Sequence, residues 1–302
     1  MRPFRFGLQV GRAVSASEWR DAARRAEDIG FSSILVPDHV AEDLLSPMVA
    51  LATMAEATTT LRVGTFVLNN DFRHPALLAR EAATIDLLTD GRLELGIGAG
   101  HAAPEYAEIG LRFDRASVRV TRLEESARLL RRLFDGEEVT AAGTHYSVHA
   151  HRLAPARRPC LMVGGNGDRV LRVGAEVADI VGFTGLGSTL ADGQRHDIQW
   201  APEQIDAKVA IVRSAAGARL DDIELNALVQ YVEITSDRVT AAERVAERLD
   251  ARELLDAPYM LIGTVAEIVE QLHAARERWG FTYFVTRDAK QTAPLIAALS
   301  GQ

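Results

Sequence analysis

Apolar runs alternate with amphipathic stretches along this chain, and the clearest example spans residues 61–100. Leu61–Leu68 is a nearly continuous apolar run, which is typical of a parallel strand buried on both faces. The polar residues Asn69-Asn70-Asp71 follow it, and apolar residues then recur at helical spacing from Pro75 to Leu88. Leu93–Ile97 is the next apolar run. The segment therefore predicts a complete strand–helix–strand unit.

The same alternation continues on both sides of this unit and predicts eight strands with helices between them. The expected strands are Arg5–Val10, Ser33–Val36, Leu61–Leu68, Leu93–Ile97, Cys160–Val163, Ile180–Phe183, Glu224–Val232 and Thr282–Val285. The expected helices are Glu18–Ile29, Pro47–Thr58, Pro75–Leu88, Ser117–Phe134, Arg169–Glu176, Glu203–Ala216, Thr240–Leu255, a helix capped by Thr264 and ending at Trp279, and Ala293–Leu299.

Three stretches break the alternation. His101–Arg115 is expected to be a loop, Gly136–Arg158 an excursion with a short hairpin around Ala142-Gly143, and Thr184–Ala201 an irregular region. Eight strands alternating with helices in 302 residues predict one (β/α)₈ TIM-barrel domain over residues 1–302, with excursions after strand four and strand six. A doubly wound parallel sheet is the alternative fold.

The composition limits which partners and which cysteine chemistry we expect. The net charge is −8 without a basic tail, so no nucleic acid is expected as a partner. Cys160 is the only cysteine, which excludes an internal disulfide and a cysteine-based metal site. No signal peptide or long apolar span is evident, so we expect a cytoplasmic protein without membrane association.

Polar side chains that follow the predicted strands are the candidates for chemistry, because active sites of TIM barrels lie at the carboxyl ends of the strands. Asp38-His39 comes directly after strand two, and His101 lies in the loop after strand four. An imidazole can donate or accept a proton near neutral pH, so both histidines are candidate catalytic residues. A helix-capping Asp and a packed His are the structural alternative. No histidine or carboxylate cluster has metal spacing, so no metal is expected.

Two glycine-rich segments also follow strands. Gly96-Ile97-Gly98-Ala99-Gly100 has the spacing of a dinucleotide fingerprint, but no helix is expected directly after it. We interpret it as backbone that must approach something flat or bulky, with a tight turn as the alternative. Gly164-Gly165-Asn166-Gly167 follows strand five and precedes a helix, where free N–H groups bind phosphate. An ordinary loop is the alternative here.

These segments together resemble the bacterial luciferase-like family, specifically its branch that uses the deazaflavin coenzyme F420. The resemblance rests on the Phe4–Val10 strand, Val36-Pro37-Asp38-His39, the whole of Leu61–Gly100, and Gly164–Phe183. It implies a TIM barrel that holds the deazaflavin ring at its mouth, with a non-proline cis peptide at Phe66–Val67 behind the ring. It also implies cofactor contacts by Asp38, His39, Phe66, Val67, Asn69, Gly164, Gly165 and Gly167. The two glycine-rich segments add Gly98, Gly100 and Asn166 to the expected cofactor contacts.

The resulting expectation is a coenzyme F420-dependent reductase or dehydrogenase acting on a small organic substrate, with His39 as the first and His101 as the second choice for the proton partner. His101 stands where a sugar-phosphate dehydrogenase relative has Glu, which argues against a sugar phosphate as substrate. The alternatives are an FMN-dependent monooxygenase on the same scaffold, a non-catalytic flavin-binding barrel and, more remotely, an aldolase or isomerase. We also expect a homodimer that pairs through the Ala- and Leu-rich helices near residues 47–58 and 75–89.

Overall fold

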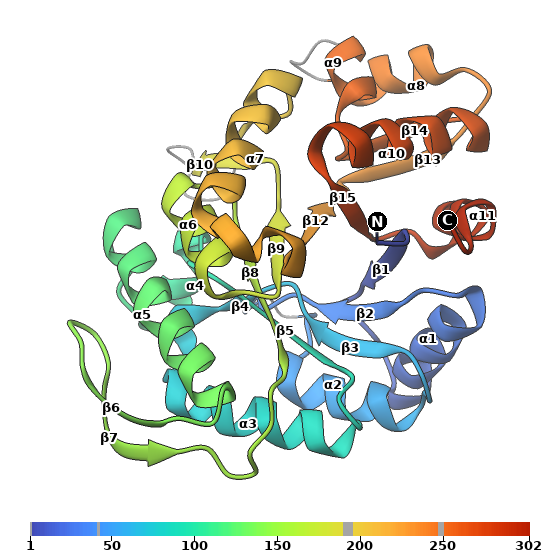
Figure 1. The fold of residues 1–302 in the computed structure, drawn as a ribbon. Coiled ribbons are helices and arrows are strands. Elements are labelled where there is room, and N and C mark those ends of the chain that lie inside the picture. The colour runs from blue at the N-terminus through green and yellow to red at the C-terminus, as the bar shows by residue number, and fades with distance from the viewer. Residues whose placement is uncertain (1, 41–42, 190–195, 247–250) are drawn as a thin grey trace.

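One closed sheet of parallel strands forms the centre of the molecule (Figure 1). The computed structural model describes residues 2–40, 43–189, 196–246 and 251–302. The order in the sheet is β3-β2-β1-β15-β12-β9-β8-β5-β4, and β3 also pairs with β5, which closes the ring. Because β3 and β4 are two parts of one strand interrupted at Phe66 and Val67, the sheet is an eight-stranded parallel barrel. This confirms the predicted TIM barrel and excludes the doubly wound sheet.

The elements alternate as expected for such a barrel. The barrel strands are β1 (Arg5–Gln9), β2 (Ser33–Val36), β3 (Arg62–Thr65), β4 (Leu68–Asn69), β5 (Leu93–Gly98), β8 (Cys160–Gly164), β9 (Ile180–Phe183), β12 (Glu224–Leu228) and β15 (Phe281–Thr286). The helices are α1 (Ala16–Ile29), α2 (Pro47–Glu56), α3 (Pro75–Leu88), α4 (Ala103–Glu108), α5 (Ala116–Phe134), α6 (Asp168–Val177), α7 (Pro202–Ala216), α8 (Arg238–Val245), α9 (Ala251–Asp256), α10 (Val265–Trp279) and α11 (Ala289–Leu299).

Among the described residues, three pairs of strands lie outside the barrel. The hairpin of β6 (Glu138–Ala142) and β7 (Ser147–Arg152) confirms the predicted one and extends away from the barrel (Figure 1). In the region expected to be irregular, β10 (Leu186–Thr189) pairs antiparallel with β11 (His196–Ile198), and residues 190–195 lie outside the described part. The third pair joins β13 (Tyr231–Ile234) to β14 (Met260–Gly263) in parallel.

The expected strand Glu224–Val232 was wrong in its extent, and β14 was missed. β12 ends at Leu228, where the backbone changes partners. Val229 N still donates to Val285 O at 2.8 Å, whereas Gln230 N donates to Tyr259 O at 2.7 Å beside β14. Both halves are apolar, so hydrophobicity alone cannot show that the chain leaves the barrel between them.

Several other boundaries also differ from those expected. Helix α4 occupies part of the expected loop 101–115, with Pro104 in its first turn, where a missing N–H does no harm. The expected helix Thr240–Leu255 contains α8 and α9, with residues 247–250 outside the described part. α11 begins before the expected Ala293, because Asp288 caps it by accepting from Gln291 N at 3.0 Å.

Two apolar clusters form the core, one inside the barrel and one outside it. The barrel interior holds Leu35, Phe66, Met162, Ile180, Leu228, Tyr283 and Val285. A much larger cluster fills the space between the sheet and the helices, and includes Trp19, Leu51, Leu123 and Leu272. In the part of the chain that the structure describes, no helix combines the length and apolar character needed to cross a membrane.

Candidate functional site at the carboxyl end of the barrel

The carboxyl ends of the strands bring most of the expected site residues to one end of the barrel. Asp38 and His39 follow β2, Asn69 ends β4, His101 follows β5, and Gly165–Gly167 follow β8. All strands of the barrel are parallel, so these ends meet around one opening, which we call the mouth.

The peptide bond between Phe66 and Val67 is cis, as the resemblance implied. The Phe66 carbonyl accepts a hydrogen bond from Gln9 Nε2 at 2.6 Å. The side chains of this segment pack against glycines of β5, β8 and β9. A Cβ on Gly98 or Gly164 would come within 2.6 or 2.7 Å of Val67, and one on Gly182 within 2.7 Å of Phe66.

These distances change the interpretation of the glycine motif after β5. Gly96 and Gly98 lie against Thr65 and Val67, and Gly100 lies against Asn69 and Tyr106. The bulky group that this backbone must approach is therefore the chain's own residues 65–69, together with Tyr106. Contacts of Gly98 and Gly100 with a cofactor remain a prediction. Helix α4 also begins at Ala103, so the expectation that no helix follows the motif was wrong.

Asp38 is held by three donors. Arg73 donates to its two carboxylate oxygens at 2.5 and 3.2 Å, and Asn69 N donates at 3.0 Å. The Asn69 side chain is also occupied, since its Oδ1 accepts from Tyr106 Oη at 3.0 Å and Asp71 N at 3.1 Å. These contacts fix the loop after β2 to the end of β4, so Asp38 shapes the mouth. Its direct contact with a cofactor, and that of Asn69, stay predictions.

His39 is oriented by a carboxylate that the sequence did not reveal. Its Nδ1 lies 2.7 Å from Glu105 Oε1, and Glu105 Oε2 accepts from Val40 N at 3.3 Å. A carboxylate on Nδ1 favours the tautomer with the proton on that nitrogen, which leaves Nε2 free to exchange a proton with a substrate. Glu105 was missed because it lies 66 residues from His39 in the chain, and no local pattern marks it.

Three imidazoles line the mouth in a row. The ring centroid of His101 lies 5.3 Å from that of His39 and 4.9 Å from that of His196 on β11. His101 is exposed to solvent by its accessible surface, yet the atoms packed around it lower its pKa to about 4, with further lowering by His39, His196 and Arg119. His101 is therefore neutral at pH 7, and its low pKa makes it a weak proton acceptor. No group of three metal-binding side chains suited to a metal ion occurs among the described residues.

The loop after β8 presents an uncapped helix start. Gly167 is the N-cap of α6, its φ is −74°, and no side chain caps the helix. A Cβ on Gly167 would have no atom within 4 Å. Asn166 is 4% exposed and donates to Gln199 Oε1 at 2.9 Å, but its buried Oδ1 has no partner within the described residues.

These features fit the cofactor that the resemblance implies. Free N–H groups at a helix start bind a phosphate, and the Asn166 oxygen can accept from a hydroxyl of the attached polyol chain. Arg169, at the start of the same helix, instead bonds to Thr121 and Glu124 of α5. The Asn166–Gln199 bond also ties this loop to the β10–β11 region, which carries His196.

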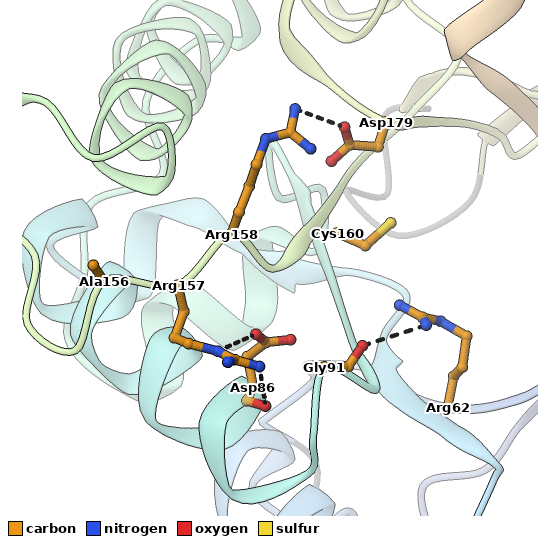
Figure 2. A pocket seen from close by; sticks show the side chains of 8 residues that line it. All are labelled: Arg62, Asp86, Gly91, Ala156, Arg157, Arg158, Cys160 and Asp179. Atoms are coloured by element: carbon orange, nitrogen blue, oxygen red, sulfur yellow. Dashed lines mark hydrogen bonds and ion pairs between the residues drawn. The ribbon is translucent and has the colours of Figure 1, made fainter.

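A pocket of about 510 Å³ lies at the opposite, amino-terminal end of the strands (Figure 2). It is lined by arginines that already have carboxylate partners: Arg62 with Glu94, Arg157 with Asp86, and Arg158 with Asp135 and Asp179. Burial raises the pKa of the Cys160 thiol there, so it stays protonated. Because its arginines are paired and its thiol is unreactive, we assign this pocket a structural role. The candidate functional site is therefore the mouth.

Comparison with known proteins agrees with this architecture. The sequence model described as luciferase-like monooxygenase matches residues 1–283. An F420-dependent glucose-6-phosphate dehydrogenase from Microbacterium testaceum (strain StLB037) is 30% identical over 187 residues, covering 59% of this chain and 55% of that protein. A 4-hydroxyprotoasukamycin monooxygenase from Streptomyces nodosus subsp. asukaensis is 28% identical over 309 residues, covering 91% of this chain and 79% of that protein.

A solved structure shows the same fold. The coenzyme F420-dependent tetrahydromethanopterin reductase from Methanopyrus kandleri superposes with a TM-score of 0.75 at 18% identity, covering 99% of this chain and 98% of that chain. The chain spans about half the length of the first curated relatives that it matches. From the family match over residues 1–283 and the closed barrel, this chain belongs to the luciferase-like monooxygenase family.

Proposed function

We propose that this protein is a coenzyme F420-dependent oxidoreductase that transfers a hydride to or from a small organic substrate at the mouth of the barrel. The observation that carries the proposal is the pairing of an uncapped, glycine-rich helix start after β8 with an oriented imidazole after β2. The names of the curated relative from Microbacterium testaceum and of the structure from Methanopyrus kandleri support the cofactor.

The bound coenzyme would supply the hydride chemistry at its ring, and the protein would bind, orient and exclude water. Gly165, Asn166 and Gly167 would hold the phosphate and the neighbouring chain, while Phe66 and Val67 would lie behind the ring. His39 would exchange a proton with the substrate through Nε2, because Glu105 occupies Nδ1. His101 is the second candidate, as a proton acceptor.

An FMN-dependent monooxygenase is the second candidate function, because the Streptomyces relative covers most of this chain. The two proposals differ in their need for oxygen. A deazaflavin lacks the ring nitrogen that supports flavin oxygen chemistry, so it favours reductase or dehydrogenase activity.

Anaerobic single-turnover assays distinguish these proposals. Protein loaded with oxidised F420 is mixed with a panel of primary and secondary alcohols, and protein loaded with reduced F420 with a panel of enones and imines. The proposal expects the absorbance of the coenzyme to change with at least one substrate class without oxygen. Turnover only with reduced FMN and oxygen would contradict it, and tight F420 binding without turnover on any panel would favour a non-catalytic binding barrel.

We also infer that two copies of the chain pair through α2 and α3. Val49, Leu77 and Leu88 are 71%, 60% and 69% exposed, and Leu77 and Leu88 lie about three turns apart on one face of α3. Pairing there should bury more than about 1,000 Å² of surface in total.

Light scattering at micromolar concentration should show that the wild-type protein is a dimer and that the double variant Val49→Arg/Leu88→Arg is a monomer. Val14→Arg, at another exposed apolar residue, is the control. A monomeric wild-type protein would contradict the inference.

A further inference from the structure

Arg287, at the carboxyl end of β15, is a cation at the mouth without a carboxylate partner. Its Nε donates to Gln9 Oε1 at 2.7 Å and its Nη1 to Gln230 Oε1 at 3.0 Å. It forms no ion pair within the described residues, and the next residue, Asp288, uses its carboxylate to cap α11. Arginines at the amino-terminal end, by contrast, face Glu94, Glu224, Asp86 or Asp179.

Two glutamines fix the guanidinium in place. A guanidinium has five N–H groups, and the two bonds to Gln9 and Gln230 leave three of them without a described partner. Gln9 is only 8% exposed, and its Nε2 donates to the carbonyl of Phe66 at 2.6 Å. A chain of hydrogen bonds therefore runs from the cis peptide through Gln9 to Arg287. The free N–H groups belong to a cation that is already oriented, which suits bidentate recognition of an oxyanion.

The position of Arg287 separates it from the expected phosphate site of the coenzyme. In the barrel order β15-β12-β9-β8, two strands lie between Arg287 and the glycine loop after β8, and Gln9 on β1 is one strand farther away. Around the other side of the closed barrel, Phe66 and Val67 lie two strands from β8 and three strands from β15. A ring held in front of them would therefore have the glycine loop on one side and Arg287 on the other. An anion at Arg287 would belong to the molecule that meets the ring.

We propose that Arg287, held by Gln9 and Gln230, binds a carboxylate or phosphate group of the substrate and thereby selects anionic substrates. This inference rests on the proposed function and extends it to a substrate class. Loss of the positive charge should weaken oxyanion binding by about 10- to 100-fold, the usual worth of a charged hydrogen-bonded pair.

The test compares Arg287→Gln and Arg287→Lys with Arg158→Gln, a matched change at the amino-terminal end. Each protein, with and without F420, is titrated with benzoate and inorganic phosphate, and with benzyl alcohol as the uncharged probe. Binding is followed by calorimetry, and the melting temperature checks the fold. We expect Arg287→Gln to lose oxyanion affinity about 10- to 100-fold, Arg287→Lys to keep much of it, and Arg158→Gln to match wild type.

Two results would overturn the inference. If Arg287→Gln weakened F420 binding without changing oxyanion affinity, the guanidinium would serve the coenzyme. If no oxyanion bound wild type more tightly than Arg287→Gln, with or without coenzyme, the residue would be structural. Oxyanion binding at Arg287 in a protein that fails to bind F420 would contradict the proposed function while supporting this inference.

Discussion

The two ends of the barrel differ in how far their polar groups are paired, because the mouth holds not only the Arg73–Asp38 ion pair but also polar groups without a described partner. At the amino-terminal end, Glu94 is 1% exposed and accepts from Arg5 at 2.7 Å, Arg62 at 2.8 Å and Tyr283 at 2.9 Å. Arg5 also pairs with Glu224 at 2.6 Å. At the mouth, the described partners of Arg287 are two amides, Asn166 Oδ1 has no described partner, and the helix start at Gly167 is uncapped.

We interpret the difference as a division of roles, in which the amino-terminal end stabilises the fold and the mouth offers polar groups to a ligand. Burial alone would raise the pKa of Glu94, but Arg5 and Arg62 lower it, so the carboxylate stays ionised as a fixed member of a buried network. A group with all its partners present has little capacity left for a ligand. Polar groups that lack partners at the mouth are those that a bound molecule can satisfy.

Removal of Glu94 is expected to have the largest effect on stability. Glu94→Ala removes the buried carboxylate that Arg5, Arg62 and the buried Tyr283 hydroxyl share, so the free energy of unfolding should fall by about 3–5 kcal/mol. Urea unfolding measures it, with the exposed Glu138→Ala expected within about 0.5 kcal/mol of wild type. A Glu94→Ala protein as stable as wild type would show that the network is dispensable.

The expected effect of His39→Ala is on rate. Loss of the imidazole should slow single-turnover hydride transfer by about 10²–10⁴-fold at saturating coenzyme while coenzyme affinity is largely kept. Glu105→Gln should cause a smaller loss, because an amide can still contact Nδ1 but is a weaker acceptor than the carboxylate and orients the ring less firmly. Normal turnover by His39→Ala with loss in His101→Ala would move the proton role to His101. Normal turnover by both would leave that role to substrate or water.

A smaller expected effect is on how the stability of the protein depends on pH. The pKa of His101 is lowered to about 4, below the usual value for an unfolded chain of about 6.5. The unfolded chain therefore binds the proton more readily, and the contribution of His101 to stability is lost as the pH falls from about 6.5 towards 4. His101→Gln should make unfolding less sensitive to acid in that range, and the exposed His149→Gln should not. Equal acid sensitivity in all three proteins would contradict the lowered pKa.

The barrel could be predicted from sequence because buried parallel strands and amphipathic helices leave separate periodic signals. Leu61–Gly100 and the Thr264 cap were placed correctly for this reason. The strands within residues 224–263 were not placed correctly, since the backbone changes its hydrogen-bond partner at Gln230. The new partner is Tyr259, which lies far along the chain.

The site was only partly predictable for the same physical reason. Asp38, His39, His101 and the glycine loop each follow a strand, which is a local signal. Contacts between distant segments, in contrast, bring Glu105, His196, Gln9 and Arg287 to the candidate site. An example is the 2.7 Å bond from Arg287 to Gln9 across 278 residues. No periodicity or motif records such a contact. The Phe66–Val67 cis bond was predicted only through family resemblance.

Parallel titration with F420 and FMN tests the central claim that the mouth holds a deazaflavin. The proteins are wild type, Gly167→Asp and Arg158→Gln, with fluorescence as the readout. Aspartate is a favourable N-cap at the φ of −74° found there, so Gly167→Asp should fold normally while its carboxylate occupies the free N–H groups and repels phosphate. We predict that wild type and Arg158→Gln bind F420 equally and more tightly than FMN, and that Gly167→Asp loses at least about tenfold. Tighter binding of FMN, or loss of F420 binding in Arg158→Gln but not in Gly167→Asp, would contradict the account.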